Sequence, residues 1–70
     1  MSKVVENYKL GNIDVTIEET DNPEKLKVIC KDDSFQMSFK ARLYEYQYYK
    51  RHMNQKIRER FEKAHNEEKG

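Results

Sequence analysis

The residues of this chain that could carry chemistry begin with its two histidines, His52 and His65. They lie 13 positions apart in a segment with the composition of a helix, so their side chains point to different faces. Glu62 and His65 have the i, i+3 spacing that some metal sites use, but no second carboxylate–histidine pair accompanies them. The sequence therefore predicts no metal site.

The other candidates for catalysis are one thiol and one pair of carboxylates. Cys30 continues the apolar alternation of Leu26 and Val28, which indicates a buried structural thiol rather than a nucleophile. Asp32 and Asp33 are adjacent, as residues that form turns often are. With only two glycines, the chain has no glycine-rich phosphate loop. We expect no catalytic residue, no cofactor and no enzymatic activity.

One cluster of residue types, in segment 44–52, does indicate binding. On a helical wheel Tyr44 and Tyr48 share a face, whereas Tyr46 lies in the apolar stripe on the other side. The face of Tyr44 and Tyr48 is polar, and folding requires no aromatic ring there. Tyrosine and arginine are enriched at interface hot spots. The predicted partner-binding residues are Tyr44, Tyr48, Arg51, Gln55 and Arg58. The simpler alternative is a solvated face whose tyrosines pack on arginine stems.

Two classes of partner fit this face. A protein partner with an acidic groove would make the chain a small protein-interaction module, acting as a regulator or a stoichiometric inhibitor. The alternative partner is single-stranded DNA or RNA, with basic side chains on the phosphates and tyrosines stacked on the bases. A net charge of only +1 favours the protein partner, because nucleic-acid binders usually carry more positive charge.

The elements that position this face begin with short antiparallel strands. Ile13, Val15 and Ile17 alternate with polar residues, the period-two pattern of a strand with one buried face. Gly11-Asn12 before them predicts a tight turn, and segment 21–24 predicts another. A third apolar face follows over 26–30.

Residues 35–39 fit a strand or a helix. As a strand, Phe35, Met37 and Phe39 alternate; as a helix, Ser34 caps an apolar stripe that starts at Phe35. The strand is preferred narrowly, because a helix over 35–66 would span ~48 Å. From Lys40 onward, helix formers without proline or interior glycine predict one long helix.

The expected fold class is therefore α+β, a three- or four-stranded antiparallel β-meander followed by one long C-terminal α-helix. We expect a single domain over residues 1–66 and a frayed tail over 67–70. This order of elements is similar to that of the Whirly-type single-strand-binding coactivator domains, which dimerise. The resemblance concerns architecture alone and carries no shared motif.

Element lengths predict a homodimer. A seven-residue strand spans ~23 Å, whereas a helix over 40–66 spans ~40 Å, so the sheet would leave the C-terminal half of the helix uncovered. An exposed apolar stripe of this kind usually marks an interface. The predicted subunit interface is Met53, Ile57, Phe61 and Ala64.

Charge and composition indicate the setting. Residues 1–39 carry five basic and eight acidic residues, a net −3, whereas residues 40–70 carry nine and five, a net +4. With one cysteine and no long apolar run, we expect no disulfide within the chain, no membrane partner and a cytoplasmic location. Frequent Lys, Asn, Tyr and Ile beside scarce Ala and Pro are typical of AT-rich genomes, which favours a phage or mobile-element accessory protein.

Overall fold

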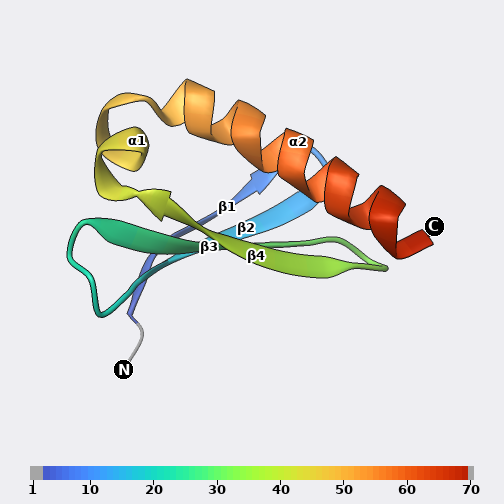
Figure 1. The fold of residues 1–70 in the computed structure, drawn as a ribbon, viewed down its shortest axis with the longest axis horizontal. Coiled ribbons are helices and arrows are strands. Elements are labelled where there is room, and N and C mark those ends of the chain that lie inside the picture. The colour runs from blue at the N-terminus through green and yellow to red at the C-terminus, as the bar shows by residue number, and fades with distance from the viewer. Residues whose placement is uncertain (1–2, 70) are drawn as a thin grey trace.

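A four-stranded sheet followed by two helices makes up the chain. The computed structural model describes residues 3–69, and the side chains of residues 3–67. The elements are β1 (Val4–Leu10), β2 (Ile13–Glu19), β3 (Lys25–Lys31), β4 (Gln36–Arg42), α1 (Leu43–Tyr48) and α2 (Lys50–Lys69). The antiparallel sheet has the order β1-β2-β3-β4, and both helices lie on the same side of it (Figure 1). The predicted α+β meander is confirmed, with four strands.

The turn between β1 and β2 consists of Gly11 and Asn12, with Leu10 paired to Ile13 on either side. Gly11 has a φ of 66°, and no other described residue has a positive φ. A positive φ at the first central position alone is the pattern of a type II′ turn, whose twist matches that of the strands. The turn thereby sets the register that places Tyr8 opposite Val15.

Replacement of Gly11 by alanine is expected to lower the free energy of unfolding by about 1 kcal/mol. A Cβ at this position would meet nothing within 4 Å, so the loss comes from the positive φ and not from a clash. Urea unfolding followed by circular dichroism measures it. Asn12→Ala, at the neighbouring turn position with a negative φ, is the control, and an equal loss there would contradict the assignment.

The loop between β3 and β4 is closed by Asp32. Its Oδ1 accepts hydrogen bonds from the backbone N–H groups of Ser34 at 2.9 Å and Phe35 at 2.8 Å. These bonds stabilise the anion and lower the pKa of the Asp32 carboxyl below its ordinary value. Beyond the loop, Met37 pairs with Cys30, which confirms the strand preferred for segment 35–39, although Phe35 itself precedes β4.

The helical region differs from the prediction at two points. Strand β4 continues to Arg42, so the helix begins at Leu43 and not at Lys40. The helix formers there are held in the sheet because Ala41 pairs with Leu26 and is only 2% exposed. Further along, Tyr49 has φ −131° and ψ 46°, which ends α1 and divides the expected single helix in two. Helix α2 then runs to Lys69, whereas Gly70 of the predicted tail lies outside the described residues.

The core lies between the sheet and α2. Met53 and Ile57 are fully buried and Phe61 is 7% exposed, so the single chain already covers them. This corrects the expectation that they are free to form a subunit interface; Ala64, the fourth residue of that prediction, is half-buried. The length comparison failed because α2 is shorter than the predicted helix and crosses the sheet diagonally (Figure 1). A homodimer stays a prediction that needs another surface.

The far end of α2 packs on the loop between β3 and β4. The ring of Phe61 meets that of Phe35 edge to face, with centroids 5.4 Å apart. The centroid of the His65 ring lies 5.2 Å from that of Phe35. These contacts extend the core beyond the ends of the strands. In the described part of the chain, neither helix is both long enough and apolar enough to cross a membrane.

Candidate functional site

The five predicted partner-binding residues are all exposed, but they do not share one straight helix. Tyr44 and Tyr48 belong to α1, whereas Arg51, Gln55 and Arg58 belong to α2. The break at Tyr49 separates the two groups. The five residues therefore do not form the single helix face that a continuous helical wheel predicts. Their most exposed aromatic member is Tyr48, at 76%.

Tyr49 is an exposed tyrosine that the predicted set of partner-binding residues does not include. In the structure it is 57% exposed, and its ring meets that of Tyr44 edge to face at 5.9 Å. The helix break turns it outward, and nothing in the wheel pattern indicates that break. We call Tyr44, Tyr48 and Tyr49 the aromatic corner.

Tyr44 stands between two surface hollows. One, with a volume of about 510 Å³, is lined by Glu24, Lys25, Arg42, Leu43, Tyr44 and Gln47. The other, of about 530 Å³, is lined by Tyr44, Glu45, Tyr49, His52 and Lys56. Both combine aromatic surface with charges of either sign. A partner side chain placed beside Tyr44 would therefore meet an apolar wall and polar groups together.

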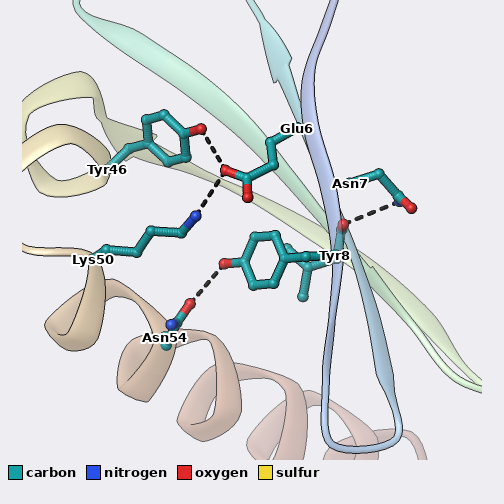
Figure 2. Close-up of polar contacts among 7 residues, drawn as sticks. Glu6, Asn7, Tyr8, Tyr46, Lys50 and Asn54 are labelled. Carbon is teal, nitrogen blue, oxygen red and sulfur yellow. Dashed lines mark hydrogen bonds and ion pairs between the residues drawn. The ribbon is translucent and has the colours of Figure 1, made fainter.

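A polar cluster on β1 holds the helices in place next to the aromatic corner. Figure 2 shows the carboxylate of Glu6 accepting hydrogen bonds from the hydroxyl of Tyr46 on α1 and, at 2.7 Å, from Nζ of Lys50 on α2. Nζ of Lys50 also lies 4.5 Å from the ring centre of Tyr8, whose hydroxyl donates to Asn54 at 2.6 Å. One strand thus fixes residues on both sides of the helix break.

The hydrogen bonds and burial in this cluster shift the pKa values of Glu6, Tyr8 and Tyr46. Hydrogen bonds from Lys50 and then Tyr46 lower the pKa of the Glu6 carboxyl, and the bond to Glu6 raises the pKa of Tyr46. Burial, aided by the negative charge of Glu6, raises the pKa of Tyr8 to about 12. At neutral pH the two tyrosines are therefore protonated donors facing ionised or polar acceptors.

A second brace joins α1 directly to α2. Glu45 is 8% exposed, and its carboxylate lies 3.5 Å from Nζ of Lys56. The sequence interpretation treated Glu45 as part of the polar tyrosine segment and missed this role, because it depends on the angle between two helices. Together the Glu6 cluster and this ion pair give the aromatic corner a fixed backbone.

Within the described residues, no group of three or more His, Cys, Asp or Glu side chains could hold a metal ion. His65 packs on aromatic rings, and Cys30 is fully buried, as predicted for a structural thiol. Comparison with protein-family models, curated proteins and solved structures finds no match for the chain. The likeness to Whirly-type domains thus remains one of element order.

Proposed function

We propose that the chain is a small protein-interaction module, of the regulator or stoichiometric inhibitor type, that docks the aromatic corner into an acidic groove of a partner protein. The observation that carries this proposal is the exposure of three tyrosines, Tyr44, Tyr48 and Tyr49, at 47%, 76% and 57%. They gather at one corner, and none belongs to the core cluster. An exposed aromatic group of this kind usually marks an interaction site.

Charge and rigidity support a protein partner. The guanidinium of Arg42 lies 6.0 Å from the ring centre of Tyr44, which gives the corner the tyrosine–arginine composition of interface hot spots. Arg51 and Arg58 lie exposed on the adjoining helix. The braces at Glu6 and Glu45 hold the corner before binding, which reduces the entropy that association costs. The basic side chains match an acidic surface on the partner. This electrostatic complementarity would mainly raise the specificity and the association rate of binding.

The test is a double variant, Tyr48→Ala with Arg51→Ala. Loss of a hot-spot side chain weakens binding by about 2 kcal/mol, or ~30-fold, so the variant should lose capture of its partner from the cells that produce it. Capture is measured by quantitative mass spectrometry with and without nuclease. Both side chains are exposed, so thermal unfolding should be unchanged.

The matched control is Lys63→Ala with Asn66→Ala, two exposed positions near the far end of α2. This control should retain every partner that the unmodified chain captures. Retention of the partner by the Tyr48 and Arg51 variant would contradict the proposal. Loss of the captured protein after nuclease treatment would also contradict it, because the protein would then have been held through nucleic acid.

A further inference from the structure

The face of the sheet away from the helices carries a group of basic residues that the sequence pattern did not reveal. We call Lys25, Lys27, Lys40 and Arg42 the basic strip; all four are exposed. Strand register places Lys25 opposite Arg42 and Lys27 opposite Lys40, on neighbouring strands β3 and β4. Among the described residues, no ion pair includes any of the four.

This arrangement works against the stability of the sheet. Like charges directly opposite each other on one face of an antiparallel pair are destabilising. Across β2 and β3 the same face follows the favourable rule, with Glu18 opposite Lys27 and Asp14 opposite Lys31. Acidic groups therefore gather on β2 and basic groups on β3 and β4. The stability of the sheet accounts for the opposite charges across β2 and β3. It does not account for the like charges across β3 and β4.

Protection of the sheet edge accounts for only half of the basic strip. Lysine and arginine on an edge strand discourage pairing with other chains, and β4 is an edge strand. This explains Lys40 and Arg42. It does not explain Lys25, which lies on β3 between two other strands, whereas Lys27 is opposite Glu18 on β2 as well as Lys40 on β4. Their alignment with the edge cations points to an anionic ligand.

The side chains of this face favour phosphate groups over bases as the contacts. Lysine binds phosphate as a point charge, and arginine binds it through two parallel hydrogen bonds. Single-strand binders add aromatic rings on which bases stack. The only aromatic residues within the four strands, Tyr8 and Phe39, pack on the core side, so the outer face offers no such platform.

We propose that the basic strip binds the phosphate backbone of double-stranded DNA. Duplex DNA has one negative charge per about 1.7 Å of its axis, so a row of cations can contact successive phosphates. The outer face of β3 and β4 is open to such a ligand because the helices lie on the other side of the sheet (Figure 1). The strip adjoins the aromatic corner at Lys25 and Arg42, which line the hollow beside Tyr44. Its proposed ligand does not depend on the proposed protein partner.

The test is fluorescence anisotropy of a labelled duplex over a salt series from about 50 to 200 mM. Four phosphate contacts give a slope of log affinity against log salt of about −3.6. Lys27→Gln with Lys40→Gln should halve this slope to about −1.8. The variant removes the like-charge pair of Lys27 with Lys40 and also the opposite-charge pair of Lys27 with Glu18, so its melting temperature should change little. A melting temperature equal to that of the unmodified chain then excludes misfolding as the cause of the loss.

The matched control is Lys3→Gln with Lys63→Gln, which changes the net charge equally at exposed positions before β1 and on α2. This control should keep the slope of the unmodified chain, and Tyr48→Ala with Arg51→Ala should keep it as well. An equal change in the Lys3 and Lys63 control would overturn the proposal, because net charge alone would then drive binding. Absence of duplex binding at low salt would overturn it too.

The nature of the ligand is tested in the same assay. A single strand of the same length and a poly-glutamate peptide compete with the labelled duplex. The proposal expects the duplex to bind most tightly. Tighter binding of the single strand would overturn the assignment to duplex DNA, and equal binding of poly-glutamate would assign the strip to an acidic protein surface instead.

Discussion

Replacement of Ile57 by alanine is expected to unfold the domain. The side chain is fully buried between the sheet and α2. Truncation of a buried isoleucine costs about 2–5 kcal/mol, while a single core in a domain of this size contributes only about 3–5 kcal/mol. Circular dichroism should show loss of both strand and helix signal at room temperature, or a melting temperature lower by tens of degrees.

The same variant distinguishes a core from a subunit interface. If Ile57 served only a dimer, the variant would remain folded as a monomer, and its sedimentation would change while its spectrum would not. Val5→Ala is the control, since Val5 is 42% exposed and its loss should change the free energy of unfolding by less than about 0.5 kcal/mol. A folded, monomeric Ile57→Ala protein would contradict the assignment of Ile57 to the core.

The domain is expected to unfold at alkaline pH near 11. Burial raises the pKa of the Cys30 thiol to about 11 and that of the Tyr8 hydroxyl to about 12. The folded state therefore holds both protons more tightly than the unfolded state does. The resulting stability is complete below the ordinary values of 9.0 and 10.0 and is lost as the pH rises through the folded values.

The size of this loss follows from the two shifts. At about pH 10 Cys30 alone removes about 1.4 kcal/mol, and at about pH 11 the two groups together remove about 3–4 kcal/mol. Urea unfolding at a series of pH values measures it. Cys30→Ala should be less stable by about 1 kcal/mol at neutral pH and yet lose about 1.4 kcal/mol less between pH 7 and about pH 10. Parallel curves for the two proteins would contradict the prediction.

Strands could be predicted from the sequence because their pattern is local. The alternation from Ile13 to Ile17 and that from Leu26 to Cys30 both lie within one strand, and Gly11-Asn12 fixes how the first two strands meet. The helix boundaries could not be predicted. Lys40 has helix propensity, but it is held in β4 because its neighbour Ala41 is buried and pairs with Leu26, a residue distant in sequence.

The candidate binding surfaces were only partly accessible to prediction. Exposure of Tyr44 and Tyr48 follows from the helical wheel, but exposure of Tyr49 depends on a break that no local signal marks. The basic strip needs the register of β3 and β4, since Lys25 and Arg42 are 17 positions apart in sequence. Counted together, the outward residues Asp14, Glu18, Lys27 and Lys31 balance in charge, which hides the row of basic residues on β3 and β4.

The order of the strands in the sheet has a consequence for the route by which the chain folds. Each strand pairs only with its neighbour in sequence, so the three hairpins close short loops whose entropic cost is small. The longest closures are those that bring β1 to the helices, such as Tyr8 to Asn54, 46 positions apart. With most pairings local, folding should be fast, on the order of milliseconds or less, and docking of α2 onto the N-terminal strand should come last.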